Sequence, residues 1–241
     1  MSVSVGVIPS RFGSTRFPGK PLAPILGRPM IRWVYEGART SKLLSRIIIA
    51  TDDERIAAVA RDFGAEAVLT SPDCASGTDR AAEVAASVPC DFVVNIQGDE
   101  PLVDGGMLDG LVRGLEEGGA PMASLMARVD DLALLGDPHV VKVVTDSTGQ
   151  ALYFSRSALP HACSDYFYQH IGIYGYRRDF LLGYKDLPPS RLEQAEKLEQ
   201  LRALESGRRI RMIEIPRPTL SVDAPADIIK VEQFLKRRSH E

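Results

Sequence analysis

Two carboxylates follow strand-like segments and could hold a metal ion. Asp99 stands in NIQGDEP at the end of an apolar run, and Asp223 stands in LSVDAPADI between another apolar run and a helix opened by Pro225. A hard cation such as Mg²⁺ takes one or two protein carboxylates and completes its shell with phosphate oxygens and water. Each carboxylate also has a structural interpretation, because Asp99 could cap a turn and Asp223 could be a helix N-cap. The spacing alone leaves both interpretations open.

The loop IPSRFGSTRFPGK, residues 8–20, is a candidate for phosphate binding. It follows a strand-like run and carries three cationic side chains, Arg11, Arg16 and Lys20. It differs from a P-loop because five residues separate Gly13 from Gly19, and because Pro21, not Ser or Thr, follows Lys20. The loop therefore has no hydroxyl beside its lysine to bind magnesium, and a metal ion must be held from elsewhere in the chain.

The segment SGTDR opens a helical pattern. Ser76 and Thr78 can cap that helix, and its free amides attract an anion or accept a base carbonyl. Arg80 lies one turn in and could instead point into solvent. By itself this segment favours a structural cap.

Weaker signals lie further along the chain. His170 shares one face of a strand with Tyr174 and Tyr176 by the period of two, although a lone histidine of this kind is usually structural. Three charged side chains occupy neighbouring positions of a helical segment, Glu196, Glu199 and Arg202. An exposed face with salt bridges is the default interpretation of such a group.

The elements that must position these residues alternate in the first half of the chain. Strand-like runs cover residues 3–8, 47–50, 67–69 and 92–96, and helical patterns cover residues 29–40, 53–63 and 78–87. The TDDE sequence at residues 51–54 supplies N-cap candidates and early acids for the second helix. Apolar strands alternating with helices indicate a parallel sheet covered on both faces, with ligands at the carboxyl ends of the strands.

The pattern changes from about residue 122. Strands are expected at residues 140–145, 151–154 and 170–176, as in a meander, then a helix over 192–206 with Gly207 as C-cap, a strand over 210–215 and a last helix from 225 to about 236. We predict an α/β fold: one three-layer, Rossmann-like, mostly parallel domain over residues 1–241, with a smaller lobe embedded at about 130–190.

The composition excludes several classes of function. The net charge of −3 gives no basic field for nucleic acid, and no apolar run approaches the length of about 20 residues that spans a membrane. The three cysteines, Cys74, Cys90 and Cys163, form no CxxC pair and indicate neither a disulfide framework nor a zinc site. With no secretory signal expected, a cytoplasmic protein is predicted.

Nine stretches stand in order along the chain. They are IPSRFGSTRFPGKPL, ATDDERI, SGTDR, NIQGDEP, HVVKVV, ALYFSR, HIGIYGY, AEKLEQLRALE and VDAPAD. Together they resemble the 3-deoxy-D-manno-octulosonate (Kdo) cytidylyltransferase family, whose members are also called CMP-Kdo synthetases. The resemblance covers almost the whole chain, and it rests on the shared order of the nine stretches, not on any one of them.

The resemblance implies a nucleotide-diphospho-sugar transferase type of fold and a reaction of lipopolysaccharide biosynthesis. CTP and an eight-carbon 2-keto sugar acid give a CMP-sugar and pyrophosphate, with the anomeric hydroxyl attacking the α-phosphorus in line. Such a transfer depends on positioning and charge neutralisation. The family pattern further implies Mg²⁺, held as a pair of ions, and a homodimer formed through the embedded lobe.

The same resemblance assigns the residues. The catalytic set is Arg11, Lys20, Asp99 and Asp223, of which Asp99 and Asp223 hold the metal. The nucleotide-binding set is Pro9, Arg11, Lys20, Ser76, Arg80 and Gln97. The sugar-binding set is Arg16, Arg156, His170, Tyr174, Glu199 and Gln200.

The chain departs from the family pattern in a few places. Many members have HxSGT where this chain has Cys74 and Ala75, and GVDTP where it has Ser221 and Ala224. The stretch from Arg156 to the next motif is short. These features resemble the branch that activates the 8-amino analogue of Kdo.

Two rival functions are weighed against this family. A CMP-sugar synthetase for a nonulosonic acid would share the loop at residues 8–20, but it is not expected to share HIGIYGY or EKLEQLR. A catalytically silent nucleotide-binding subunit is the other rival. Retention of the four catalytic residues argues against a silent subunit.

Overall fold

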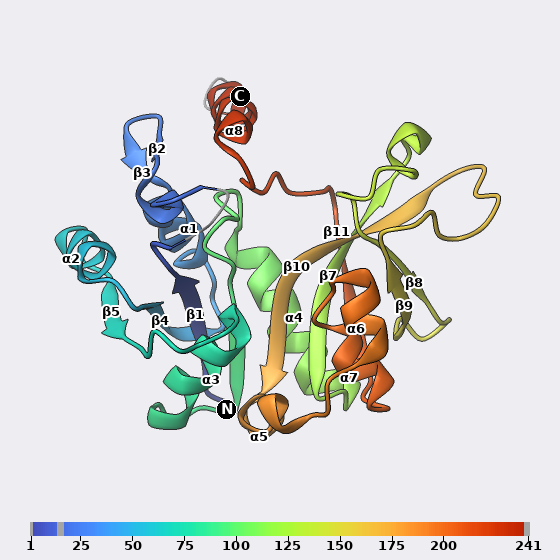
Figure 1. Ribbon diagram of the computed structural model, residues 1–241, viewed down its shortest axis with the longest axis horizontal. Helices are drawn as coiled ribbons and strands as arrows, with labels where there is room; N and C mark the ends of the chain where they lie inside the picture. The colour runs from blue at the N-terminus through green and yellow to red at the C-terminus, as the bar shows by residue number, and fades with distance from the viewer. Residues whose placement is uncertain (1, 14–16, 239–241) are drawn as a thin grey trace. The chain divides into compact units, whose positions relative to one another are not determined.

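The computed structural model describes residues 2–13 and 17–238. Its chain divides into two compact units, Met1–Asp109 together with Thr219–Glu241, and Gly110–Pro218. Figure 1 shows strands alternating with helices in the first unit and a group of longer strands in the second. In the described part of the chain, no helix is both long and apolar enough to cross a membrane.

The first unit is built on four parallel strands in the order β6-β1-β4-β5. The strands are β1 (Ser4–Ser10), β4 (Leu44–Thr51), β5 (Glu66–Leu69) and β6 (Phe92–Asn95). Every residue of β1 and β6 is buried, as the apolar runs of the sequence predict for strands covered on both faces. The predicted parallel sheet is confirmed, and it brings the carboxyl ends of β1 and β6 side by side.

Three helices connect these strands, α1 (Met30–Ala38), α2 (Glu54–Asp62) and α3 (Gly77–Ser87). Asp53 is the N-cap of α2 and accepts the N–H of Arg55. Ser76 is the N-cap of α3 and forms a capping box with Asp79. The predicted caps at these two helices are therefore confirmed, and the other aspartate of the TDDE sequence, Asp52, is left for a different role.

The first unit also contains short elements that directly follow the loop at residues 8–20, and the last helix of the chain, which packs against them. They are the short helix η1 (Lys20–Leu22), the hairpin of β2 (Pro24–Ile25) and β3 (Arg28–Pro29), and the last helix, α8 (Pro225–Arg238). Ile25 and Val231 belong to one buried cluster, and the N–H of Leu26 donates to Glu232. These contacts fix the chain just after Asp223 against the N-terminal segment.

The boundary between the units falls inside α4 (Gly105–Gly118), a helix that the sequence analysis did not predict. In the second unit, β7 (Met122–Val129) pairs in parallel with β11 (Ile210–Ile215) and antiparallel with β10 (Phe167–Arg177). The shorter strands β8 (Lys142–Thr145) and β9 (Ala151–Ser155) extend this sheet antiparallel. The connections contain η2 (Leu132–Leu134), α5 (Arg178–Leu182) and η3 (Tyr184–Asp186). Residues 130–190, predicted as a lobe, fall within this unit.

The single helix predicted over residues 192–206 is wrong. Two short helices occupy this segment, α6 (Arg191–Glu196) and α7 (Leu201–Glu205). Lys197 ends α6 in the left-handed region, at φ 55°, which a helical pattern of apolar and charged residues cannot reveal. Glu199 and Gln200 consequently lie on the link between the helices. Ser206 is the C-cap of α7, and Gly207, predicted as the C-cap, is the next residue and ends the helix in the left-handed region at φ +72°.

Candidate active site

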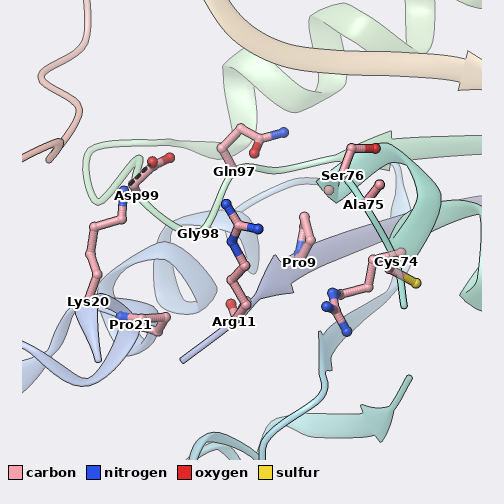
Figure 2. A pocket seen from close by; sticks show the side chains of 13 residues that line it. Pro9, Arg11, Lys20, Pro21, Cys74, Ala75, Ser76, Gln97, Gly98 and Asp99 are labelled. Carbon is pink, nitrogen blue, oxygen red and sulfur yellow. Dashed lines mark hydrogen bonds and ion pairs between the residues drawn. The ribbon is translucent and has the colours of Figure 1, made fainter. Parts of the chain in front are cut away.

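A pocket of about 260 Å³ opens in the first unit where β1 and β6 end and α3 begins. Figure 2 shows Lys20 and Asp99 at one end of it, Cys74, Ala75 and Ser76 at the other, and Arg11 between them. The predicted residues that line this pocket are Pro9, Arg11, Lys20, Ser76, Arg80, Gln97 and Asp99. The strand-end rule therefore located the pocket correctly.

Two glycines allow the pocket walls to approach each other closely. A Cβ on Gly98 would lie 2.9 Å from the carbonyl oxygen of Pro9, and a Cβ on Gly77 would lie 3.1 Å from the Pro9 ring. Larger residues at either position would force the end of β1 away from β6 or from α3. The sequence analysis did not identify these glycines, or Ser10 and Pro21, as pocket residues. The signals that could have identified these glycines are the GD pair at the end of the strand-like run, residues 98–99, and the SGT sequence at the start of the helix, residues 76–78.

Lys20 connects three segments at the acidic end of the pocket. Gly19, at φ +71°, donates its N–H to the carbonyl of Phe12, and this closes the loop just before Lys20. The Lys20 Nζ lies 2.6 Å from Asp99 Oδ2 and 3.0 Å from the carbonyl oxygen of Val222. The N–H of Val222 in turn donates to the carbonyl of Asp99. One ammonium group thus holds the strand end that carries Asp99 beside the segment that carries Asp223.

Asp227 holds the backbone at the start of α8. The side chain of Asp227 accepts the N–H groups of Asp223 and Ala224 at distances of 3.1 and 3.0 Å. Asp223 itself is exposed. The helix start is therefore stabilised by Asp227 in addition to any contact that Asp223 makes.

Negative charge accumulates beside Lys20. Glu100 is buried, and its Oε2 atom has no hydrogen-bond partner in the described structure. Burial, followed by repulsion from Asp99 and Asp223, raises the pKa of Glu100 to about 8, although Thr219 and Lys20 oppose the shift. Both aspartates are therefore near enough to Glu100 for their charges to act on its pKa.

Arg80 is buried at the wall of the pocket, so the expectation that it could point into solvent is wrong. Only 4% of its side chain is exposed. It donates to the Thr70 hydroxyl, the Ser71 carbonyl and the Asp52 carboxylate. Ser76, at the start of the same helix, uses its hydroxyl to cap the backbone. Two of the residues predicted for the nucleotide therefore lie at the start of α3, Ser76 as its N-cap and Arg80 at the end of its first turn.

The wall between Ser71 and Ser76 is fixed by a second contact to α3. Glu83 accepts the N–H of Ser71 and the thiol hydrogen of Cys74, whose Sγ lies 3.2 Å from Oε2. Burial and the Glu83 carboxylate raise the pKa of Cys74 to about 11. This thiol is protonated near neutral pH and serves as a hydrogen-bond donor at a position where HxSGT sequences have histidine.

In the second unit, three of the predicted sugar-binding residues form one hydrogen-bonded chain. The Tyr174 hydroxyl lies 3.2 Å from Gln200 Oε1, and Gln200 Nε2 lies 3.4 Å from His170 Nδ1. His170 Nε2 lies 2.8 Å from the Ser124 hydroxyl. Burial lowers the pKa of His170 to about 3 and raises the pKa of Tyr174 far above its usual value, so both side chains are neutral. This series of hydrogen bonds passes through Gln200, which lies on the link between α6 and α7.

Arg156 is held at the other end of that link. Its Nε donates to the carbonyl of Glu196 at 2.8 Å, and its Nη1 donates to the carbonyl of Pro138 at 2.9 Å. The Glu196 carboxylate accepts the Ser155 hydroxyl and the Arg156 N–H. Glu196 is therefore a partner of β9 and not part of an exposed salt-bridged face. Glu199 is half-buried, and its carbonyl accepts the Tyr184 hydroxyl.

Comparison with known proteins decides the family. The sequence profile described as cytidylyltransferase matches residues 5–210. The chain belongs to the cytidylyltransferase family. Curated relatives named 3-deoxy-manno-octulosonate cytidylyltransferase confirm the resemblance inferred from the nine stretches. One from Syntrophotalea carbinolica is 48% identical and covers 98% of this chain and 99% of its own length. One from Syntrophobacter fumaroxidans is 51% identical and covers 96% of each chain.

Solved structures agree with this membership of the cytidylyltransferase family. A CMP:2-keto-3-deoxy-manno-octonic acid synthetase in complex with CTP superposes with a TM-score of 0.93 at 41% identity, and the match covers 98% of this chain and 100% of the other. A cytidylyltransferase from Leptospira borgpetersenii has a TM-score of 0.64 at 16% identity over 98% of this chain and 87% of its own. The second likeness shows the shared fold alone. The predicted α/β fold is confirmed.

The acidic end of the pocket in this cytidylyltransferase fits a divalent cation. Asp99 and Asp223 offer hard oxygen ligands. Both carboxylates raise the pKa of the buried Glu100, whose Oε2 atom has no hydrogen-bond partner in the described structure. No group of three or more acidic, histidine or cysteine side chains arranged to hold a metal occurs among residues 2–13 and 17–238. Two carboxylates suit Mg²⁺, which takes one or two from the protein and the rest of its ligands from phosphate and water.

The structure thus brings together two sets of predicted residues, each within its own unit. The nucleotide and metal set lies in the first unit, and the set with His170, Tyr174 and Gln200 lies in the second. Arg16, predicted to bind the sugar, lies outside the described residues.

Proposed function

We propose that this cytidylyltransferase activates 3-deoxy-D-manno-octulosonate with CTP, giving CMP-Kdo and pyrophosphate for lipopolysaccharide biosynthesis. The observation that carries the proposal is the 41% identity, over 98% of the chain, to a synthetase of the same product class in complex with CTP. The pocket residues supply the chemistry that this reaction needs, because cations, the first amides of α3 and the Asp99 carboxylate stand together at the strand ends.

The nucleotide is proposed to bind along the pocket of Figure 2. Arg11 and Lys20 lie where they can neutralise the triphosphate, and the first turn of α3, with Ser76 and Arg80, lies where it can hold the nucleoside. Pro9 and Gln97 complete the same wall. Lys20 must then exchange some of its contact with Asp99 for a phosphate oxygen.

The transfer forms one bond and breaks one bond. The anomeric hydroxyl oxygen of the sugar acid bonds to the α-phosphorus, the bond to the pyrophosphate oxygen breaks, and the hydroxyl proton leaves to solvent. We propose that Asp99 and Asp223 hold Mg²⁺, which would neutralise charge on the phosphate and carboxylate oxygens. The protein residues bring the reacting oxygen and phosphorus together and exclude competing water.

The sugar acid is proposed to contact the neutral hydrogen-bonding chain of the second unit. His170 and Tyr174 carry no charge near pH 7, so they suit the hydroxyl groups of the sugar better than its carboxylate. Gln200, between them, offers an amide that can both donate and accept. Arg156 and Glu199 remain assigned to this site as part of the proposal, together with Arg16. A homodimer and a cytoplasmic location are likewise proposed.

Pyrophosphate release tests the proposal directly. The purified chain is incubated with CTP and MgCl₂ and with Kdo, its 8-amino analogue or a sialic acid, and UTP replaces CTP in a parallel series. We expect turnover with CTP and Kdo. Faster turnover with the 8-amino analogue would reassign the sugar, turnover with the sialic acid alone would favour a nonulosonic acid synthetase, and CTP binding without turnover on any sugar would indicate a silent nucleotide-binding subunit.

A further inference from the structure

The adjacent carboxylates of the TDDE sequence have separate partners. Asp53 caps α2 and pairs with Arg55, whose guanidinium is on the surface. Asp52 accepts a hydrogen bond from Arg80 Nη2 at 3.0 Å across a separation of 28 residues, and 22% of its side chain is exposed. Helix capping therefore accounts for Asp53, whereas Asp52 lies outside α2 and does not cap it.

The position of Arg80 is unfavourable for stability unless a counter-ion is present. Arg80 lies on the first turn of α3, where the helix dipole opposes a positive charge. It is also almost fully buried, and a buried cation that lacks an anionic partner carries a large desolvation cost. Asp52 provides that partner from the end of β4. The packing of α3 alone gives no reason to place a guanidinium here.

The guanidinium is fixed in orientation by three contacts. Nη1 donates to the Thr70 hydroxyl at 2.5 Å and to the Ser71 carbonyl at 3.3 Å, and Nη2 donates to Asp52. Thr70 is itself held, because its hydroxyl and its N–H both donate to the carbonyl of Thr51. A guanidinium has five N–H groups, so two have no partner among residues 2–13 and 17–238 and remain for a ligand. Thr51 at the end of β4 and Thr70 just after β5 therefore fix the plane of the Arg80 guanidinium, which lines the pocket.

We infer that Asp52 is a positioning residue for the nucleotide, which acts through Arg80 because it does not itself line the pocket. The inference rests on the proposed function, which makes the pocket ligand CTP. Asp52 holds the buried guanidinium with its two free N–H groups presented to an acceptor oxygen of the nucleotide. Loss of the Asp52 charge therefore weakens nucleotide binding and leaves the chemical step and the binding of the sugar acid unchanged.

The test compares Asp52→Asn with Asp53→Asn. Both variants change one carboxylate to an amide at adjacent positions, and asparagine remains a good N-cap at residue 53. CTP affinity is measured by calorimetry without the sugar acid, and KM for each substrate and kcat are measured by pyrophosphate release. We expect Asp52→Asn to raise the Kd and KM for CTP about tenfold, as for loss of a charge-assisted hydrogen bond, while kcat and the KM for the sugar acid stay within about twofold. Asp53→Asn should match the wild type.

A second variant covers the case in which Asp52→Asn does not fold. Thr70→Val keeps the shape of residue 70 and removes only the hydroxyl that Arg80 Nη1 contacts, and we expect a rise of about threefold in the Kd for CTP. An unchanged CTP affinity in a folded Asp52→Asn protein, or in Thr70→Val when Asp52→Asn is unfolded, would overturn the inference. So would an equal effect of Asp53→Asn, or a fall in kcat at constant KM for CTP. A wild-type chain that binds no CTP would instead overturn the proposed function itself.

Discussion

The contact between Lys20 and Asp99 predicts a measurable loss of stability when the ammonium is removed. Lys20→Met keeps most of the aliphatic side chain and deletes the charge. The side chains of Lys20 and Asp99 are 16% and 29% exposed, so the pair is only partly screened by water. The same ammonium also satisfies the Val222 carbonyl. The variant therefore loses one charge-assisted hydrogen bond to a carboxylate and one to a carbonyl.

The magnitude follows from these two contacts. A hydrogen bond to a charged group contributes about 1.5–3 kcal/mol, and partial hydration of the released groups returns some of that free energy. We take about 2 kcal/mol for the net loss in the free energy of unfolding. For a chain of this size, that loss lowers the unfolding midpoint by about 4–8 °C. A change in Asp99 that also breaks the pair should not add fully to this loss.

Thermal unfolding followed by circular dichroism, without CTP or magnesium, measures the effect. Lys230→Met is the matched control, because Lys230 pairs with Asp227 at 3.0 Å but is 67% exposed, and such a pair contributes only about 0.3 kcal/mol. The double variant Lys20→Met with Asp99→Asn should be less destabilised than the sum of the single variants. A midpoint for Lys20→Met within about 1 °C of the wild type, or full additivity in the double variant, would refute the reasoning.

Three further predictions concern the carboxylates and the buried histidine. Asp99→Asn and Asp223→Ala should each lower kcat at least about 100-fold, and near-wild-type turnover in either variant would exclude its metal role. Asp223→Ala should change the unfolding midpoint little because Asp227 also holds the start of α8, whereas Asp99→Asn should lower the midpoint about as much as Lys20→Met because it breaks the same ion pair. Glu100 has a folded pKa above its unfolded value, so its contribution to stability is present below about pH 4.5 and is lost as the pH rises through about 8. Glu100→Gln should therefore weaken the dependence of the free energy of unfolding on pH over this range, measured without metal. An unchanged pH dependence would contradict a buried, protonated carboxyl group. His170 has a folded pKa below its unfolded value, so its contribution to stability is present above about pH 6.5 and is lost on acidification towards pH 3. Between pH 7 and pH 5, the free energy of unfolding of the wild type should fall by about 2 kcal/mol more than that of His170→Gln. Equal losses would argue against a neutral His170.

Local sequence patterns predicted most elements of the first unit. The period of apolar residues defined the four strands of its parallel sheet and the three helices that connect them, and short-range signals identified the caps Asp53 and Ser76. The strand-end rule then placed Asp99 and the loop after β1 at one pocket. These features depend on interactions within a few residues, or on a general property of parallel sheets, and a sequence carries both kinds of information directly.

Other features depended on contacts that local patterns do not encode. The α6–α7 segment reads as one helix because its spacing is helical, yet a single left-handed residue, Lys197, interrupts it and places Gln200 on a link beside His170. Helix α4 was missed because its glycines lower its helical propensity, and three of them, Gly110, Gly114 and Gly118, lie where a side chain would meet Arg211 or Ile213 of β11.

Tertiary structure alone decided the partners of the charged side chains. The sequence determined that Asp52, Arg80, Lys20 and Asp99 stand at strand and helix ends, but not which of them pair. Lys20 meets Asp99 across 79 residues and Val222 across 202, and Arg80 turns inward to Asp52 instead of out to solvent. The physical reason is that a charged side chain known only from the sequence has many possible partners. When the folded chain buries it, only a partner that offsets its desolvation cost is stable beside it.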